Sequence, residues 1–298
     1  MVAVPSLSSG LVRAFLLLVL ILAGWPAHAQ RAYDQAALAA LLERDAPMPV
    51  EPVRYRQYRV EHASGNSILA RHELYEQIGQ GNRDLGRARL ALGQLLGQPD
   101  LATLRIGESI VLPARPADFE LSPLAYAPYP VSWPGAAGRD RVVVVDLTTQ
   151  TWAAYGKGEL LRWGPASTGK VATPTPTGRF TMNWRALERE STEAPPGETW
   201  MMRYVMNIHL ARGIHLHQYN VVPSGPPEGH GCIRLVTSDA RWLWGWTGGD
   251  KTALGTVVIV QGTTPSATPV RFVDGPGGPE RVQIPLPADP MSVPRGDR

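Results

Sequence analysis

Hydrophobic residues follow two spacings along this chain, and the change from one to the other falls near residue 140. N-terminal to this point, apolar residues recur every three or four positions in the segments 36–44, 68–78 and 87–97. That spacing is typical of amphipathic helices. C-terminal to it, apolar and β-branched residues alternate or run together, as in strands. We therefore predict a small, mostly helical N-terminal domain over residues 30–113 and a mainly β domain over residues 140–262.

The mainly β domain contains several strand-like segments and one helix-like segment. Residues 140–168 are β-branched around a Gly-Lys-Gly turn, which predicts two strands joined as a hairpin. Further strands are predicted at 179–184, 200–210, 213–219 and 256–262. Residues 237–246 predict a short helix, with Thr237 or Ser238 as N-cap and Asp239 in the first turn.

Proline and glycine mark the connecting segments. Residues 114–139 are rich in proline and show little periodicity, which predicts a semi-rigid linker. The polar, proline-broken segment 185–198 predicts an exposed loop, and a lid over a site is one role open to it. Residues 263–298 are rich in Pro and Gly and predict an extended or disordered tail.

The N-terminus has the layout of a secretory signal peptide over residues 1–29. Arg13 precedes a short apolar run, and Ala27-His28-Ala29 is a small-x-small cleavage site. The run is shorter than the roughly 20 residues of a membrane span. An uncleaved anchor is the alternative. We expect an exported protein, in the periplasm or cell wall, that does not span the membrane after cleavage.

The charge of the chain gives no support for nucleic acid as a partner, and its cysteine count singles out Cys232. The formal net charge is +3 and the arginines are scattered, so nothing favours nucleic acid as a partner. The chain has a single cysteine, Cys232, which cannot form an internal disulfide. An odd cysteine in an exported protein indicates a reactive thiol or an intermolecular link. The alternative is a buried, inert cysteine that packs as a small hydrophobe.

The segment GPASTGKV (164–171) nearly spells a phosphate-binding P-loop. Val171 stands where the motif requires a magnesium-binding hydroxyl, and the following ATPTPTG cannot form a helix. No helix N-terminus would therefore point at a phosphate. The segment instead predicts a turn and a proline-rich loop that lead into the strand at 179–184.

Histidines surround Cys232 in the sequence. His230 lies two residues before it, and His215 and His217 alternate with apolar residues on a predicted strand, so both face one side. The prolines of segment 218–229 favour a loop that returns to this strand. A nearby histidine is the usual activator of a cysteine nucleophile.

Other residues of the segment fit acyl-transfer chemistry. Gly229 and Gly231 permit unusual backbone angles and close approach of a substrate, and backbone N–H groups near Cys232 could form an oxyanion hole. Arg234 is suited to pairing with a carboxylate. Zinc is the competing interpretation, but the H-x-H…H-x-C spacing lacks paired Cys-x-x-Cys or His-Glu-x-x-His and has no neighbouring carboxylate. We expect no metal.

The motif GHGCIRL (229–235) resembles the His-Gly-Cys-hydrophobic-Arg/Asn signature of the L,D-transpeptidases, the YkuD family. ASTGKVATPTPTGRFTM (166–182), GIHLHQY, DARWLWGW and GTVVIVQG are similar to other family segments, in the family's order. The ending LRIGESIVLP (104–113) resembles degenerate LysM-like, peptidoglycan-binding modules. The resemblance implies a β-sandwich with a short helix after the nucleophile, and a role in cell-wall biogenesis and cell shape.

The resemblance also implies roles for the site residues. Cys232 would be the nucleophile, with oxyanion donors at Gly231 and Cys232, and His230 would orient the loop or the thiol. Two histidines are candidates for the general base: we expect His217, and His215 is the alternative. If His217 is the base, we expect His215 to bind substrate, as we do Arg234. One departure is Gly229, where the family usually has Ser or Thr.

The implied reaction joins peptidoglycan stem peptides through a thioester and needs no metal or organic cofactor. The same site would be an L,D-carboxypeptidase or a cross-link hydrolase if water took the acyl group. A non-catalytic wall-binding module is a third interpretation. A cysteine protease would be expected to carry its nucleophile on a long helix, which this glycine-flanked segment does not suggest.

Overall fold

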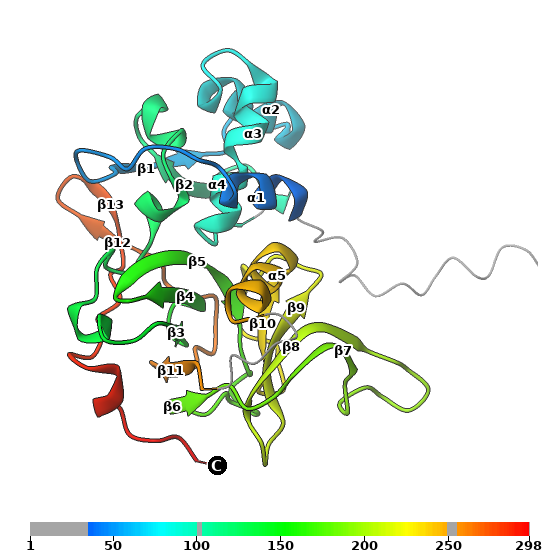
Figure 1. Ribbon diagram of the computed structural model, residues 1–298. Coiled ribbons are helices and arrows are strands. Elements are labelled where there is room, and N and C mark those ends of the chain that lie inside the picture. Colours follow the sequence, from blue (N-terminus) through cyan, green and yellow to red (C-terminus); the bar gives the residue numbers. More distant parts are fainter. Residues whose placement is uncertain (1–34, 100–102, 249–254, 298) are drawn as a thin grey trace, which may run out of the picture. The chain divides into compact units, whose positions relative to one another are not determined.

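A mixed β-sheet is the largest element of the structure, a computed structural model that describes residues 35–99, 103–248 and 255–297. Its strands are β3 (Val142–Asp146), β4 (Thr151–Gly156), β5 (Glu159–Ser167), β6 (Gly178–Thr181), β7 (Arg185–Glu190), β8 (Met201–His209), β9 (Ile214–Tyr219), β10 (Ile233–Val236) and β11 (Val257–Gln261). They hydrogen-bond in the order β6-β11-β3-β4-β5-β10-β9-β8-β7 (Figure 1). Residues 140–168 thus form three strands, not the predicted two, since β3 and β4 are separate strands.

The sheet curls so that its two halves share one core. Valines of β3 alternate between two buried clusters, which explains why this strand reads as a continuous apolar run. One cluster joins Val143 and Val145 of β3 to Leu216 of β9, Leu235 of β10 and Leu243 of the helix α5 (Thr237–Trp246). Because strands from both ends of the sheet contribute to this cluster, the predicted mainly β domain closes around it.

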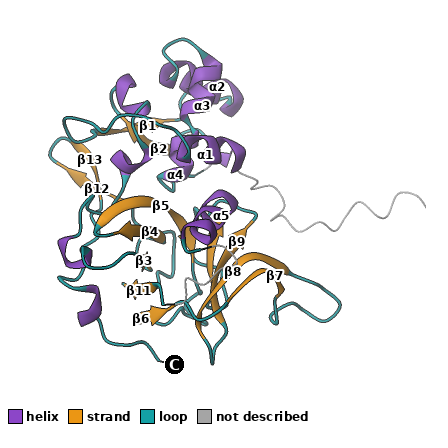
Figure 2. Ribbon diagram, viewed as in Figure 1, coloured by secondary structure: helices purple, strands orange, loops and turns teal. Residues whose placement is uncertain are grey.

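On their other face, β3, β4 and β11 contribute to a second buried cluster, which also contains residues of the segment 114–139 and of the N-terminal part of the chain. Figure 2 shows the helices of that N-terminal part above β5 and α5. That part contains α1 (Gln35–Leu42), β1 (Tyr55–Arg59), α2 (Ser67–Ile78), α3 (Arg83–Arg89), α4 (Ala91–Leu95) and β2 (Ser109–Pro113). β1, which was not predicted, pairs antiparallel with β2. The described residues belong to one compact unit, and a separate helical N-terminal domain stays a prediction.

Residues 114–139 are packed, which corrects the prediction of a semi-rigid linker. They form the short 3₁₀ turns η2 (Pro116–Phe119), η3 (Pro123–Tyr126) and η4 (Pro134–Ala136). Tyr126, Tyr129 and Trp133 are buried in the same cluster as the outer face of β3. The prolines favour the 3₁₀ turns by fixing φ at their first positions, while the aromatic residues between them supply the packing.

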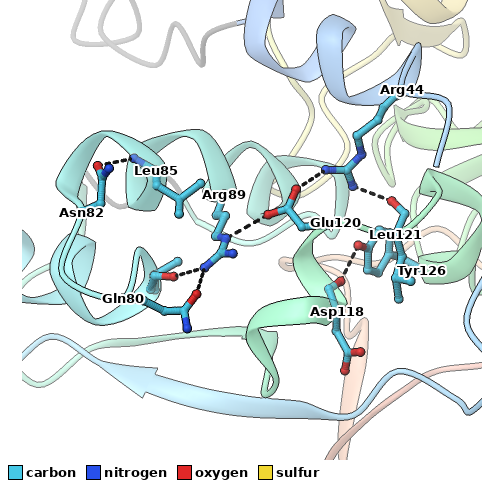
Figure 3. A network of polar contacts seen from close by, with 10 residues as sticks. Arg44, Gln80, Asn82, Leu85, Arg89, Asp118, Glu120, Leu121 and Tyr126 are labelled. Carbon is cyan, nitrogen blue, oxygen red and sulfur yellow. Dashed lines mark hydrogen bonds and ion pairs between the residues drawn. The ribbon is translucent and has the colours of Figure 1, made fainter. Parts of the chain in front are cut away.

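A polar network fastens this segment to the helices (Figure 3). Glu120 lies between two arginines, 3.1 Å from Arg89 Nε and 3.3 Å from Arg44 Nη1. Arg89 Nη1 also donates to the carbonyl of Ile78 at the end of α2. Arg44 donates to the carbonyl of Leu121. The contacts tie α1, α2 and α3 to one short stretch of the predicted linker.

The C-terminal residues 263–297 include a hairpin and a 3₁₀ turn, so the prediction of an extended or disordered tail is wrong for them. β12 (Phe272–Gly275) and β13 (Gly278–Arg281) form a hairpin, and η5 (Pro290–Ser292) comes after it. Arg271 is buried and donates to the carbonyls of Thr149 and Gly97. The tail therefore connects the β4 region with the end of the N-terminal helices, although its sequence has few apolar residues.

The predicted loop at 185–198 is partly a strand. Arg185–Glu190 is β7, the edge strand that pairs with β8. Only the residues between β7 and β8 form the connecting loop. Charged residues are common on edge strands because they discourage pairing with another chain, which explains the polar sequence RALERE.

The helix α5 has the predicted bounds but not the predicted cap. Thr237 is its first residue, and Val236, at the N-cap position, gives no side-chain hydrogen bond. The acceptor is supplied from 202 residues away, since Thr237 N–H donates to Gln35 Oε1 at 3.0 Å. Gln35 Nε2 in turn donates to the carbonyl of Tyr219 at 2.9 Å. One glutamine of α1 thus joins the N-terminal helices to β9 and α5.

A buried ion pair that includes Asp239 of α5 makes a second connection, to Glu43 next to the end of α1. Asp239, which is fully buried, accepts from Arg162 Nε at 2.8 Å and from the indole of Trp152 at 3.2 Å. Arg162 Nη1 also donates to Glu43 at 2.9 Å. Because each charge has a partner, the pair tolerates its removal from water.

Among the described residues, no helix combines the length and apolar character needed to cross a membrane. The predicted signal peptide, residues 1–29, lies outside the described residues.

The two hydrogen bonds of Gln35 give a testable prediction. Replacing Gln35 by Ala leaves the N-terminus of α5 without its acceptor, so we expect the free energy of unfolding to fall by about 1 kcal/mol. Urea unfolding followed by far-UV circular dichroism measures the change. Gln57→Ala, at an exposed position of β1, is the matched control and should change stability by less than about 0.5 kcal/mol. Equal losses in both variants would contradict the capping role.

Candidate active site

Cys232 lies at the end of the loop that enters β10. β10 runs parallel to β9, and Ile233 pairs with Leu216. Parallel pairing then places the preceding residue, Cys232, beside His215. The contact is direct, since Cys232 Sγ is 3.6 Å from His215 Nδ1 and 3.7 Å from the carbonyl oxygen of Gly213. The structure therefore joins the single cysteine to a strand histidine, as the sequence predicts.

The histidine in contact is His215, whereas the sequence analysis favoured His217. Ile214 and Leu216 pack in the core, so the two histidines lie on the other face of β9. His217 Nδ1 is 2.8 Å from the carbonyl oxygen of Gln218 and its ring lines the cavity in front of Cys232. The pairing offset between β9 and β10 decides which histidine meets the thiol, and residue alternation alone cannot supply that offset.

The loop before Cys232 is held by the segment that resembled a P-loop. Gly229 and Gly169 form a parallel bridge, in which Gly229 N–H donates to Thr168 O and Lys170 N–H donates to Gly229 O, both at 2.9 Å. The buried Thr175 hydroxyl donates to Gly231 O at 2.8 Å and accepts from Gly169 N–H at 2.9 Å. Residues 168–175 thus act as a clamp on the backbone of residues 229–231.

Two glycines of the loop are required by this close approach. Gly231 has φ +113°, and a Cβ there would lie 2.6 Å from Ile214 Cδ1. A Cβ on Gly229 would lie 2.7 Å from Thr168 O. Gly229 replaces the Ser or Thr of the family signature, and here the clamp leaves no room for a side chain. The close approach of the Thr168 backbone therefore explains why glycine occupies position 229.

Burial sets the protonation of the Cys–His pair. Burial raises the pKa of the Cys232 thiol, an effect opposed by a hydrogen bond with the backbone of His215 and by the charge of Arg234. Burial lowers the pKa of His215 to about 4, and the charge of Arg189 adds to the decrease. At neutral pH both effects favour a neutral thiol beside a neutral imidazole. His215 is then able to accept the thiol proton when an electrophile arrives.

A tryptophan that the sequence analysis did not single out packs against His215. The Trp184 and His215 rings meet edge to face, with centroids 5.0 Å apart. The Arg189 guanidinium lies over the Trp184 ring, 4.6 Å from its centroid. His215 Nε2 is buried and, within the described part of the chain, has no hydrogen-bond partner. The His215 ring is therefore positioned by its Nδ1 contact with Cys232 and by packing against Trp184.

A cavity of about 460 Å³ opens in front of Cys232. Its walls come from three places: the β7–β8 connection, the end of β9 and the loop that carries the cysteine. Its lining includes Glu193, Trp200, His217, His230, Cys232 and Arg234. The loop of the β7–β8 hairpin thus borders the cavity, as the sequence suggested for a lid. The cavity's size is within the range of small-ligand pockets.

His230 and Arg234 are near the thiol but have different surroundings. His230 is exposed, and its Nε2 lies 3.5 Å from Lys170 Nζ. Arg234 is half-buried on β10, with its guanidinium 4.6 Å from the centroid of the Tyr219 ring. Both border the cavity. In the part of the chain that the structure describes, no three His, Cys, Asp or Glu side chains are arranged to hold a metal ion.

Part of this chain is similar to known proteins. Residues 140–260 match the family model YkuD, the L,D-transpeptidase catalytic domain. L,D-transpeptidase 1 of Mycobacterium tuberculosis (strain ATCC 25618 / H37Rv) is 30% identical over 115 residues, which cover 34% of this chain and 44% of that protein. The chain thus matches less than half the length of this relative. The family model and the relative support an L,D-transpeptidase catalytic domain in residues 140–260.

Solved structures of similar proteins include two mycobacterial examples. An L,D-transpeptidase from Mycobacterium smegmatis has 25% identity, covering 41% of this chain and 58% of that chain, with a TM-score of 0.35. A crystal structure of Mycobacterium tuberculosis L,D-transpeptidase 1 has 25% identity, covering 41% of this chain and 62% of that chain, with a TM-score of 0.33. Both TM-scores are below 0.5.

The protonation of the pair predicts how the thiol reacts with iodoacetamide. Since the pKa of Cys232 is raised, the alkylation rate should still be rising above about pH 8.5, the ordinary pKa of a free cysteine. A preformed thiolate–imidazolium pair would instead give a plateau of reactivity well below about pH 7. Mass spectrometry of the intact protein gives the rate, and Cys232→Ala should not be labelled. A low-pH plateau would refute the neutral pair.

The clamp predicts a large effect of removing one hydroxyl. Thr175→Val keeps the shape of the side chain but leaves Gly169 N–H and Gly231 O without their partner. We expect the free energy of unfolding to fall by about 1–3 kcal/mol, measured by urea unfolding. Iodoacetamide labelling of Cys232 should also change because the loop is less restrained. Thr177→Val, at an exposed position of the same segment, is the control; the prediction fails if the two variants behave alike.

Proposed function

We propose that this protein is an L,D-transpeptidase that cross-links or remodels peptidoglycan through a thioester on Cys232. The observation that carries the proposal is the contact of 3.6 Å between Cys232 Sγ and His215 Nδ1 at the wall of an open cavity. The family match over residues 140–260 supports the choice of substrate class. A thiol beside a neutral imidazole is the arrangement that nucleophilic acyl transfer requires.

The first half-reaction forms the thioester. The resemblance implies a tetrapeptide stem whose last bond joins the L-centre of a diamino acid to D-Ala. His215 takes the thiol proton as Sγ attacks the carbonyl carbon, and the oxyanion accepts from the backbone N–H groups of Gly231 and Cys232. The C–N bond then breaks, and D-Ala leaves with the proton returned by the imidazolium. His215 replaces His217 as the proposed base because it touches the thiol.

The second half-reaction releases the acyl group. The amine of a second stem attacks the thioester carbon, His215 takes a proton from this amine, and the C–S bond breaks as the thiol is protonated again. A new amide bond joins the two stems. No metal or organic cofactor takes part in any of these steps.

Some residues of the cavity are assigned to binding the substrate, and others to shaping the cavity or orienting the loop that carries Cys232. Arg234 borders the cavity and is suited to a substrate carboxylate, although its stacking on Tyr219 also gives it a structural role. Trp200 and Glu193 extend the cavity along the β7–β8 connection, where a stem peptide would lie. We assign His217 to the cavity wall, since its Nδ1 lies beside the carbonyl of Gln218. His230 is assigned to the orientation of the loop, since its ring lies near Lys170.

The location and the N-terminal region belong to the same proposal. Peptidoglycan lies outside the cytoplasm, so the protein would be exported by the signal peptide predicted over residues 1–29 and act in the periplasm or cell wall. The LysM-like resemblance of residues 104–113 is supported by the strand β2, which forms within this segment. We extend the proposal to a glycan-binding role for the N-terminal region.

Hydrolysis is the main alternative outcome at the same site. If water replaced the acceptor amine, the protein would be an L,D-carboxypeptidase or a cross-link hydrolase with the same acyl-enzyme. The two differ in the product and not in the intermediate. A non-catalytic wall-binding module would form no intermediate.

The acyl-enzyme gives the decisive test. The mature protein is incubated with a disaccharide tetrapeptide and followed by intact-protein mass spectrometry. We expect a covalent adduct on wild type and none on Cys232→Ala. His215→Ala should slow acylation by about 10²–10⁴-fold, the usual contribution of a general base, whereas the matched variant His217→Ala on the same strand should acylate at a rate near that of wild type.

Each result has a different meaning for the proposal. Cross-linked soluble products indicate transpeptidation, and tripeptide products indicate hydrolysis. Loss of acylation in His217→Ala but not in His215→Ala would reverse the assignment of the base. A folded wild-type protein that forms no adduct would leave only the wall-binding module.

A further inference from the structure

A second cavity lies among segments that the proposed reaction does not use. Its volume is about 570 Å³, and it shares no lining residue with the cavity at Cys232. Three segments form it: the residues before and within β1, the region of η3, and the β12–β13 hairpin with the residues after it. Two of these three segments fall in the predicted linker and the predicted tail.

The inner wall of this cavity carries a buried cation. Arg281 of β13 lines the cavity and is 8% exposed. Its Nε and Nη1 are buried and have no hydrogen-bond partner among the residues that the structure describes. Within the described residues, no carboxylate lies within ion-pair distance of this guanidinium. A buried arginine almost always pairs with an acceptor, so two unpaired donors point to a missing partner.

Aromatic contacts hold the guanidinium without using its donors. Arg281 Cζ lies 4.8 Å from the Trp163 centroid and 5.3 Å from the Phe272 centroid. Such contacts fix the plane of the cation through the ring faces and give its buried Nε and Nη1 no acceptor. Burial lowers the pKa of Arg281 to about 10, partly opposed by Tyr55 and Tyr129, so the group is still charged at neutral pH.

The remaining walls indicate the shape of a partner. Pro49, Pro52, Val53 and Leu124 give the cavity an apolar side, and the hydroxyl-bearing rings of Tyr55 and Tyr129 also belong to the lining. The charged residues of the lining besides Arg281 are Arg54, which is exposed, and Glu280. Glu280 folds back over its own hairpin, since a Cβ on Gly275 would lie 2.2 Å from Glu280 Oε1.

We propose that this cavity binds a carboxylate with a small apolar body, through the guanidinium of Arg281. A carboxylate matches the fork of guanidinium donors in a way that water does not, because two of its oxygens accept side by side. Two sources share this chemistry: a free small carboxylic acid and the C-terminal carboxylate of a short peptide. The site is independent of the reaction at Cys232.

The test uses the full chain with Cys232→Ala, so that no reaction at the thiol contributes. Propanoate, N-acetylalanine, N-acetylalanine amide and the peptide Ala-Ala-Ala are titrated in turn by calorimetry, with Trp fluorescence as a second readout because Trp163 touches Arg281. We expect N-acetylalanine to bind at least tenfold more tightly than its amide, which differs only in lacking the charge. Tighter binding of the peptide than of propanoate would identify a peptide terminus, and equal binding would identify a small acid.

Three variants test whether carboxylates bind in this cavity or elsewhere on the protein. Arg281→Gln should weaken binding of N-acetylalanine at least tenfold. Ala127→Phe fills the cavity from another segment and leaves Arg281 in place, so it should also abolish binding and serves if Arg281→Gln does not fold. Arg54→Gln changes an exposed arginine of the same lining and should bind like the parent protein.

Two results would overturn the proposal. One is the absence of binding by any of the carboxylates to the folded parent protein, which would mean that water alone satisfies Arg281. The other is unchanged affinity in both Arg281→Gln and Ala127→Phe. Neither result depends on whether Cys232 forms a thioester, so the proposed function is tested separately.

Discussion

The hydrogen-bonded clamp between residues 168–175 and 229–231 is the constraint on which the candidate site depends. A cysteine at a loop end has no fixed position of its own, and the pairing of β10 with β9 fixes only the residues after it. Thr175 bonds both sides of the junction, at Gly169 N–H and Gly231 O. With the loop fixed on one side and β10 paired on the other, the thiol is held 3.6 Å from His215. The same clamp excludes a side chain at Gly229.

The environment of the pair gives the site its chemical character. Burial disfavours both the thiolate and the imidazolium. The proton therefore moves from Cys232 to His215 only when a substrate accepts the electron pair of the sulfur. A thiol that is neutral at rest is also less easily oxidised, since the thiolate is the form that oxidises. Arg189, acting over Trp184, increases this effect on His215.

The rest of the chain supports the sheet from its outer face. α1 supplies Gln35 to the start of α5, and Glu43, next to the end of α1, pairs with Arg162. The C-terminal segment places Arg271 against the carbonyls of Thr149 and Gly97. These contacts join segments that are far apart in sequence. The helix α5, which follows β10, is therefore stabilised partly by the N-terminal region, which explains why the described residues belong to one compact unit.

Local pattern was enough to predict β5, β6, β8, β9 and β11 and the bounds of α5, because strand alternation and helix periodicity are properties of neighbouring residues. It missed β7 and β10 and did not separate β3 from β4. Local pattern could not decide whether His215 or His217 contacts the thiol. Both histidines lie on one face of β9, and only the pairing register of β9 with β10 determines which of them lies beside Cys232. The packing of residues 114–139 and 263–297 was also decided by tertiary structure. Their prolines and glycines indicate loops, whereas their order comes from buried aromatic rings and from arginines such as Arg271, whose partners are distant backbone carbonyls.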